Sequence, residues 1–322
     1  MYDKTIWPFN HLTFQRYFMK KILIAGGTGL LGTRLSFLLQ EKGYQVLHLS
    51  RQQNLDATFP AYKWDLKEKY IDPSAMNQAD VIINLAGAGV ADARWTDARK
   101  KLIIDSRVDS ASLLKSYISS GKTPAKTYLS ASAIGYYGDR GNQLLKETDP
   151  PGDEGFLPKS VVAWENAINE VAGTGIRTVA FRIGIVLSTK GGALEKMLIP
   201  FNFFNGTYFG DGSMYYSWIH IDDMARMFIE AIENEQLEGV YNGVAPNPAS
   251  NKEIILACKK ALGKPALVMP APAFALRTAM GEMADMILDS ARVSSEKIKK
   301  AGFRFHFPEL LPAIKDLLER KI

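Results

Sequence analysis

Cysteine and histidine are both scarce in this sequence. Its 322 residues include one cysteine, Cys258, which excludes an internal disulfide and a cysteine-rich metal site. The four histidines include no close pair, so no histidine-based metal cluster is expected and no metal is assigned. Such sparing use of cysteine is typical of a reducing compartment, and we expect a cytoplasmic protein.

Long apolar runs and blocks of like charge are also absent. The longest uncharged stretches, such as 197–210, contain proline, asparagine and glycine and fall short of the about 18 apolar residues that a membrane span requires. The net charge of +5 is spread along the chain, and no basic block is longer than 99–101. We therefore expect no membrane and no nucleic-acid partner, but a small-molecule substrate. The oligomeric state stays open.

Residues 1–18 read as an N-terminal extension. Asp3, Pro8 and His11 stand where a signal peptide would be uniformly apolar, so no targeting signal is expected. An upstream start or a short arm is favoured, and an aromatic arm that packs onto the protein is the alternative. Met19 follows, and after it comes the pattern of a buried first strand.

Short apolar runs alternate with longer helical patterns between residues 20 and 181. Strands are predicted at 20–25, 45–49, 61–64, 80–85, 126–131 and 176–181. Helices are predicted between them at about 30–42, 95–119 and 158–172. This alternation is typical of βαβ units, and it predicts an α/β fold with a Rossmann-type doubly wound parallel sheet.

The rhythm changes after residue 182 to loops and shorter elements. Helices are expected near 192–204, 222–233, 250–262, 272–288 and 308–321. We predict a nucleotide-binding domain over 19–182, with a core that extends to about 245. A smaller substrate lobe spans 183–322 and includes a helical segment at about 270–320, where Met280, Met283 and Met286 are expected to pack in the core.

A glycine-rich turn joins the first predicted strand to the first predicted helix. It reads GGTGLLG over 26–32. Because glycine has no Cβ, a pyrophosphate can approach the backbone amides there and face the positive end of the helix. Dinucleotide contacts are therefore predicted for Gly26, Thr28, Gly29, Leu30, Leu31 and Gly32.

The end of the second strand indicates which dinucleotide is bound. An acidic residue there binds the ribose hydroxyls of NAD, whereas an arginine accommodates the 2′-phosphate of NADP. This chain has Ser50 and Arg51, and no carboxylate before Asp56. NADP is favoured over NAD, with Arg51 as a solvated loop cation being the alternative.

The next two strand ends supply further predicted cofactor contacts. They are Asp65, Leu66, Leu85, Ala86 and Gly87. Asp65 is placed to hydrogen-bond the adenine amino group, and a helix cap is its alternative role.

Several spaced motifs resemble the extended and atypical short-chain dehydrogenase/reductases, in their sugar-nucleotide epimerase-like branch. More narrowly, the chain resembles epimerase-like oxidoreductases that carry an extra C-terminal domain of unknown function and are sometimes mislabelled cell-division inhibitors. The resemblance covers 19–318. Its most specific pieces are 130–138 (SASAIGYYG), 94–96 (RWT) with 106–107 (SR), 181–187 (FRIGIVL), 217–223 (SWIHIDD) and 302–305 (GFRF).

The resemblance implies a serine that binds the substrate oxygen and a tyrosine, in a Tyr-x-x-x-Lys helix, that moves the proton. Ser132 fills the first role, with Ser130 or a strand-end cap as the alternative. The second motif is missing, because 156–165 contains no tyrosine. Either Tyr136 or Tyr137 transfers the proton, or the protein binds its cofactor without turnover.

The resemblance also implies the remaining contacts. Ser130, Arg182 and Ile185 are assigned to the cofactor, and Arg94, Trp95, Trp218 and His220 to the substrate. The alternative for Trp218 and His220 is packing at the junction of the lobes, with Asp222 as a helix cap. The alternatives for Arg182 are a clamp for a substrate anion and a buried ion pair.

The function expected from these residues is that of an NADP(H)-dependent oxidoreductase acting on a small carbonyl-type substrate. One alternative is a sugar-nucleotide epimerase or dehydratase, against which Arg51 and the missing Tyr-x-x-x-Lys pair both count. The other is a catalytically weak NADP-binding redox sensor. The missing pair supports the sensor, whereas the retained Ser132 and the tyrosine pair favour an enzyme.

Overall fold

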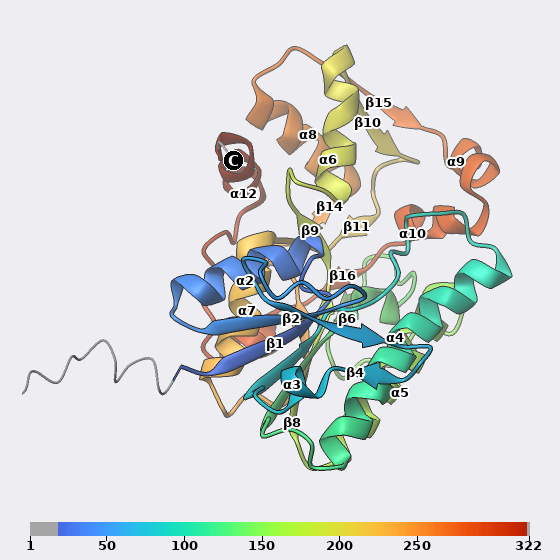
Figure 1. The fold of residues 1–322 in the computed structure, drawn as a ribbon. Helices are drawn as coiled ribbons and strands as arrows, with labels where there is room; N and C mark the ends of the chain where they lie inside the picture. The colour runs from blue at the N-terminus through green and yellow to red at the C-terminus, as the bar shows by residue number, and fades with distance from the viewer. Residues whose placement is uncertain (1–18, 321–322) are drawn as a thin grey trace, which may run out of the picture.

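An eight-stranded sheet forms the centre of the protein in a computed structural model that describes residues 19–320 (Figure 1). The strand order is β13-β8-β6-β5-β1-β2-β3-β4, and all neighbours are parallel except β3 and β4. The strands are β1 (Lys21–Ala25), β2 (Gln45–Ser50), β3 (Ala61–Asp65), β4 (Tyr70–Ile71), β5 (Val81–Asn84), β6 (Thr127–Ala133), β8 (Arg177–Ile183) and β13 (Gly239–Gly243). This confirms the doubly wound α/β sheet.

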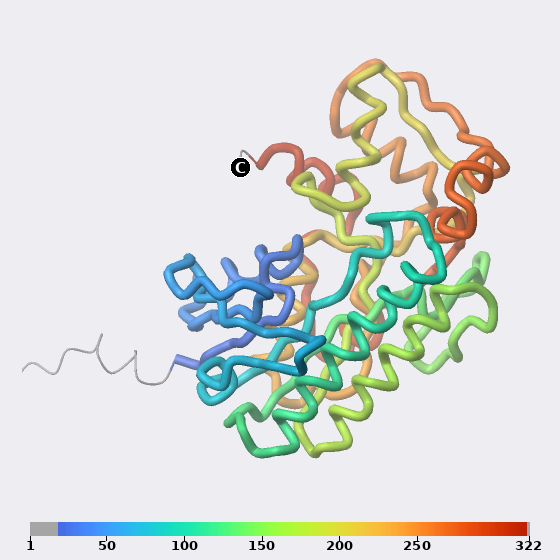
Figure 2. Tube along the Cα trace, turned by 45° about the vertical axis from the view of Figure 1, so that its right-hand side comes forward, coloured from blue at the N-terminus to red at the C-terminus, as the bar shows by residue number. Residues whose placement is uncertain are grey.

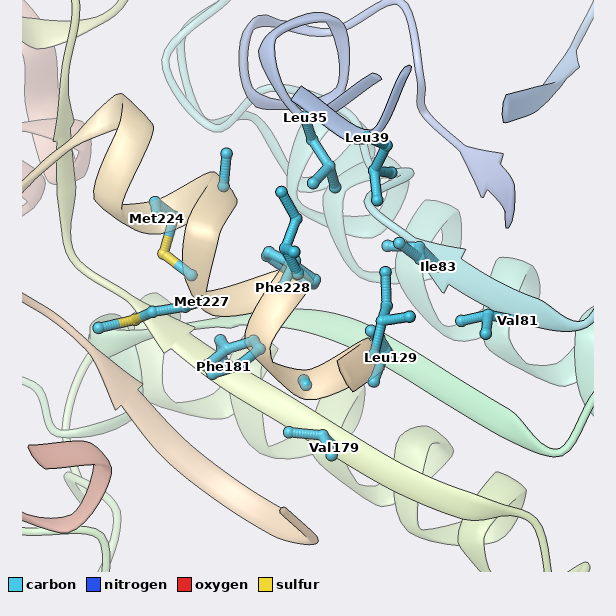
Figure 3. Packing of buried hydrophobic residues seen from close by; sticks show 14 of the residues in the cluster. Leu35, Leu39, Val81, Ile83, Leu129, Val179, Phe181, Met224, Met227 and Phe228 are labelled. Carbon is cyan, nitrogen blue, oxygen red and sulfur yellow. The ribbon is translucent and has the colours of Figure 1, made fainter. Parts of the chain in front are cut away.

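Helices cover both faces of this sheet. On one face lie α2 (Leu30–Glu41) and α7 (Ile221–Glu233), and on the other lie α4 (Asp97–Ser119) and α5 (Phe156–Ala172). Figure 3 shows Leu35 of α2 and Phe228 of α7 above Phe181 of β8. A short helix, α3 (Pro73–Met76), packs beside α4, and α11 (Glu296–Lys300) lies against β13.

The winding of the sheet reverses at β1. From there the chain adds β2 on one side and β5 on the other. The carboxyl ends of β1 and β5 therefore meet at a topological switch point, where sheets of this kind bind ligands. The predicted glycine turn follows β1 at this point.

The smaller lobe is built from short elements above the carboxyl edge of the sheet (Figure 2). Its strand pairs are β10 (Asn205–Phe209) with β15 (Leu267–Ala271), and β11 (Tyr215–Tyr216) with β14 (Ala249–Ser250). Two further pairs join it to the sheet: β9 (Ile185–Leu187) with β12 (Trp218–His220), and β7 (Leu144–Leu145) with β16 (Arg292–Val293). Its longer helices are α8 (Asn251–Leu262) and α12 (Leu310–Glu319).

Two of the helices predicted for this lobe are interrupted. The segment predicted at 192–204 divides into α6 (Ala193–Leu198) and the 3-10 turn η2 (Ile199–Phe203). The segment predicted at 272–288 divides into α9 (Ala273–Met280), η3 (Gly281–Ala284) and α10 (Asp285–Leu288). Gly281, with φ of +61°, ends α9 because a continuing helix requires negative φ.

The chain enters the smaller lobe twice. It leaves the sheet after β8 and returns through β12 and α7 to the edge strand β13, then leaves again. The predicted helix at 222–233 is therefore α7 of the sheet domain, packed on α2. Within the described range no helix has the length and apolar character that crossing a membrane requires.

Candidate active site

The glycine turn after β1 is shaped by close packing. Gly26 has φ of +81°, and a Cβ there would lie 2.8 Å from the carbonyl carbon of Leu85. A Cβ on Gly32 would lie 2.4 Å from the carbonyl oxygen of Gly26. Both positions therefore need glycine for the fold itself, whatever is bound.

Gly29 is different, because the space beside it is open. A Cβ there would meet a single neighbour, the carbonyl oxygen of Gly26, at 3.3 Å. Gly29 is the N-cap of α2, no side chain caps the helix, and the first turn holds no acidic residue. The exposed Thr28 and the amides of Leu30 and Leu31 complete an open helix N-terminus that fits a pyrophosphate.

The neighbouring strand ends hold the other predicted cofactor residues. Ser50 ends β2, and Arg51 follows it as an exposed side chain outside the salt bridges of residues 19–320. Asp65 accepts hydrogen bonds from the amides of Lys67 and Glu68 at 2.9 and 3.2 Å. Asp65 thus caps a turn after β3 and not a helix, while Leu66 packs into the core beneath.

A loop after β5 runs beside the glycine turn. The Leu85 amide donates to the carbonyl of Ala25, and the buried side chain of Asn84 accepts from the Ala86 amide at 3.2 Å. Gly87 is exposed and lies against Arg107, whose Cζ would be 3.0 Å from a Cβ at this position. Leu85, Ala86 and Gly87 therefore stand where sequence reasoning placed them, at the switch point.

The predicted catalytic serine belongs to a buried polar network. Ser132 is 2% exposed, and its hydroxyl donates to Glu165 Oε1 at 2.6 Å. Arg182 donates to both oxygens of Glu165 at 2.8 Å. Burial alone would lower the pKa of Arg182, but the ion pair with Glu165 holds it above its ordinary value. Arg182 thus takes its buried ion-pair role, and Ser132 is engaged internally.

Tyr137 lies deeper in the same network. It is fully buried, and its hydroxyl contacts Asn242 Oδ1 at 2.8 Å and Arg182 Nη1 at 3.0 Å. Burial raises its pKa to about 12. The ring of Tyr136 lies under the Arg182 guanidinium, with 3.4 Å between Cζ and the ring centroid. The pair therefore supports Arg182, and a direct proton transfer from the buried Tyr137 is disfavoured.

The residues assigned to the substrate are not brought together. Trp218 is fully buried and donates to the carbonyl of Asn247 at 2.9 Å. His220 is also fully buried and caps α7 by accepting from the Asp222 amide at 3.1 Å. Both pack the junction of the lobes, and the helix cap is His220, not Asp222. Asp222 instead pairs with Arg34 and Arg320.

The other two substrate assignments, Arg94 and Trp95, lie immediately before Thr96, the N-cap of α4. Trp95 donates from Nε1 to the carbonyl of Val90 at 2.8 Å and packs edge-on against Phe156. Arg94 is exposed and reaches the carbonyl of Thr278 at 3.4 Å. Ser130, assigned to the cofactor, is fully buried in β6. Each position has a structural explanation in these contacts.

A cavity of about 270 Å³ opens between the sheet and the smaller lobe. Helix α5 contributes one face, Leu157, Ser160, Val161 and Trp164, spaced as successive turns require. The strand ends contribute residues around Ala133, Gly184 and Ile185, and the smaller lobe contributes Tyr215, Tyr216, Ser217, Met286, Asp289 and Ala291. Leu157 and Val161 stand on the cavity face of α5, where a Tyr-x-x-x-Lys motif would present its side chains.

Arg107 and Asp289 both line the cavity, and both have shifted pKa values. Arg107 lies over the Trp164 ring at 4.9 Å and donates to the carbonyls of Ala88 and Ile103. Burial, together with the nearby Arg99, lowers its pKa to about 10. Asp289 lines the wall contributed by the C-terminal segment, and burial raises its pKa to about 6.

Sequence reasoning missed most of this cavity. Arg107 was part of a quoted motif and carried a signal, and Leu157 and Trp164 share a helix face that the spacing of α5 reveals. Asp289 has no local signal, because its place depends on how the C-terminal segment folds back. Met286, expected in the core, lines the cavity as well. Among residues 19–320 no group of three or more potential metal ligands exists.

The fold and the site define a class: dinucleotide-binding α/β proteins with a smaller lobe over the carboxyl edge of the sheet. The chain belongs to the NAD dependent epimerase/dehydratase family, whose model matches residues 22–242. Residues 271–317 match a second model, a domain of unknown function, DUF1731. The resemblance identified from the sequence motifs is thereby confirmed.

Individual relatives span nearly the whole chain. The mouse (Mus musculus) epimerase family protein SDR39U1 is 33% identical over 301 residues, which is 92% of this chain and 99% of the relative. The Bacillus subtilis epimerase family protein YfhF is 34% identical over 299 residues, covering 92% and 97%. Both are described only by family, so neither supplies a substrate.

A solved structure is similar over the same length. The crystal structure of human epimerase family protein SDR39U1 (isoform 2) with NADPH has a TM-score of 0.85 and 32% identity, and covers 93% of this chain and 99% of the human chain. The Thermus thermophilus UDP-glucose 4-epimerase complex with NAD has a TM-score of 0.71 at 19% identity, over 94% and 100%. At that identity it supports the fold alone.

Proposed function

We propose that this protein is an NADP(H)-dependent oxidoreductase that acts on a small, mainly apolar carbonyl compound. The observation that carries this proposal is the position of the cavity. It lies at the carboxyl ends of β6 and β8, on the same edge of the sheet as the open glycine turn. A dinucleotide bound along that edge reaches the cavity with its nicotinamide.

NADP is the proposed dinucleotide. The exposed Arg51 after β2 offers a cation to a 2′-phosphate, and Ser50 offers a hydroxyl beside it. The relative crystallised with NADPH supports the same choice. When bound, NADPH would supply a hydride. The residues of this chain would bind and orient the dinucleotide and exclude water from the cavity.

The dimensions of the cavity restrict the substrate. Ligand pockets typically measure roughly 300–1,000 Å³, so 270 Å³ suits a compact molecule. Its walls are mainly aliphatic and aromatic, with Tyr215 and Tyr216 on one side and Trp164 on another. These features favour a small planar carbonyl compound over the sugar nucleotide of an epimerase.

The buried network beneath the cavity has a positioning role in this proposal. Ser132, Glu165 and Arg182 tie the ends of β6 and β8 to α5. Because the cavity wall includes Ala133 and Ile183, the next residues along these strands, the network fixes the wall against which the reaction would occur.

A redox sensor that binds NADP without turnover is the second candidate. The observation that favours it is the cavity face of α5, where Leu157 and Val161 offer no group that moves a proton. The two candidates differ in one result. A sensor binds NADPH but does not oxidise it, whichever carbonyl compound is added.

Calorimetric titration with NADPH and NADH tests the choice of cofactor. We expect NADPH to bind at least tenfold more tightly, since charge-assisted contacts contribute about 1.5–3 kcal/mol. Arg51→Ala should remove this preference. Lys126→Ala, an exposed cation before β6 at the opposite edge of the sheet, is the matched control and should leave it unchanged. Equal affinity of the wild type for both dinucleotides would contradict the assignment.

A further inference from the structure

Most polar groups around the cavity are already engaged in internal hydrogen bonds. The Ser160 hydroxyl donates to the carbonyl of Leu157 at 2.8 Å, and the Ser217 hydroxyl donates to that of Ala291 at 2.7 Å. The Tyr216 hydroxyl donates to the carbonyl of Ile287. A ligand in the cavity therefore has few partners to meet.

Asp289 is a clear exception. It follows α10, and its amide donates to the carbonyl of Asp285 at 2.9 Å. Within residues 19–320 its carboxyl accepts no hydrogen bond that would lower its pKa. A half-buried carboxyl on an apolar wall, without a donor of its own, is a group that a ligand can satisfy.

The backbone that carries Asp289 is fixed on both sides of the cavity. The Ser290 hydroxyl donates to the carbonyl of Gly141 at 2.7 Å, in a loop of the sheet domain. The Ala291 amide donates to the carbonyl of Tyr215 at 3.1 Å, in the smaller lobe. Asp289 is thus held at the wall by the two residues that follow it.

The charges around Asp289 disfavour its ionised form. Burial is the largest cause, and Asp285 on α10 and Asp139 in the loop after β6 add like charges. Arg277 on α9 opposes them, but it is paired with Asp285 at 2.6 Å. Tyr216 on β11 also lies near Asp289, but its hydroxyl carries no positive charge that could stabilise the carboxylate. Together these groups raise the pKa of Asp289 to about 6, so a neutral carboxyl is accessible near neutral pH.

We propose that Asp289 is the proton donor of the cavity and that its neutral carboxyl donates a hydrogen bond to the carbonyl oxygen of an uncharged, planar ligand. Asp289 lies in the segment that matches the domain of unknown function, together with Met286 and Ala291. The proposal therefore gives that segment a role: it closes the cavity and supplies its acid.

The proton-transfer half of this inference rests on the proposed function. In the reduction, the carbonyl carbon gains a hydride from NADPH, the C=O π bond breaks, and the oxygen takes the proton of Asp289. The products are the alcohol, NADP⁺ and the Asp289 carboxylate, which regains a proton from water. The binding half requires no cofactor.

Ligand binding without turnover provides the first test. The probe is acetophenone, a small aromatic ketone, titrated calorimetrically into the full chain at pH 5 and pH 8. With a pKa of about 6, about nine-tenths of Asp289 is neutral at pH 5 and about one-hundredth at pH 8. The wild type should therefore bind acetophenone at least tenfold more tightly at pH 5.

Two variants separate the carboxyl from its surroundings. Asp289→Asn keeps a donor that does not ionise, so it should bind acetophenone at pH 8 about as tightly as the wild type does at pH 5. Asp289→Leu removes the donor and should bind weakly at both pH values. Asp153→Asn, which makes the same change at an exposed carboxylate outside the cavity lining, is the matched control and should keep the wild-type ratio.

Turnover gives the second readout. At pH 5, where the wild-type carboxyl is also neutral, Asp289→Asn should lower kcat for any ketone that the wild type reduces by roughly 10² or more, with KM nearly unchanged, because asparagine donates a hydrogen bond but no proton. A wild-type affinity for acetophenone that is equal at both pH values, or no binding at pH 5, would overturn the proposal. NADPH titration of the same samples reports separately on the proposed function, since its failure would leave the pH-dependent binding intact.

Discussion

Gly29 offers the sharpest separation between folding and cofactor binding. Its backbone, with φ of −72° and ψ of 171°, is accessible to any residue. A Cβ at this position meets one atom, at 3.3 Å, and otherwise projects into the space assigned to the pyrophosphate. Gly29→Val should therefore leave the melting temperature nearly unchanged while it blocks the dinucleotide.

The size of the effect follows from the contacts that would be lost. Each charge-assisted hydrogen bond from an amide to a phosphate oxygen contributes about 1.5–3 kcal/mol, and displacing the pyrophosphate from the first turn of α2 removes at least one. NADPH affinity should fall by at least tenfold. Calorimetry gives the affinity, and thermal unfolding followed by circular dichroism verifies the fold.

Gly32→Ala is the informative contrast. Its Cβ would lie 2.4 Å from the carbonyl oxygen of Gly26, so overpacking should destabilise the fold by about 1–3 kcal/mol. Substitution of Gly29 should thus impair NADPH binding, whereas substitution of Gly32 should impair folding. A Gly29→Val variant that is folded and binds NADPH with wild-type affinity would refute the pyrophosphate site.

Three further predictions concern stability. Burial lowers the pKa of His48 to about 4, whereas in the unfolded chain this residue is protonated below about pH 6.5. The free energy of unfolding should therefore fall by about 3 kcal/mol by pH 4, and His48→Gln should not show this loss. Glu165→Gln should destabilise the protein by about 3–5 kcal/mol in urea unfolding, because it leaves the buried Arg182 without its anion; adding Arg182→Met should recover part of this loss. The raised pKa of Asp289 means that the folded state holds its proton more tightly, so stability falls as pH rises from about 4 to 6; Asp289→Asn should melt higher than the wild type at pH 8 and no higher at pH 4.

The sheet was predictable because its signals are local. Each predicted strand of the sheet is present, and the glycine turn and the Ser50–Arg51 strand end stand at the carboxyl edge as expected. Gly43 is a local signal of the same kind: it follows the C-cap of α2 with φ of +87°, a conformation that glycine adopts most readily. Strand β13 escaped prediction because GVYNG is too short and too rich in glycine to stand out from its surroundings.

The cavity was less predictable because it depends on distant contacts. Ser132, Arg182 and Tyr137 all carry polar groups at suggestive positions, yet they satisfy one another within the core. Nothing in the sequence shows that Glu165, a turn beyond Val161 on α5, supplies the carboxylate for this network. Asp289 reaches the cavity only because residues 290–293 pair with segments far away in sequence.

The measurement that tests the central claim most directly is the transfer of a labelled hydride. The protein is incubated with NADPH deuterated at C4, separately in each stereochemical form, and with a panel of small aromatic ketones, and the products are analysed by mass spectrometry. The account predicts an alcohol that carries one deuterium on the former carbonyl carbon from one of the two forms. Bound NADPH that remains reduced, with no labelled alcohol from any ketone, would contradict it.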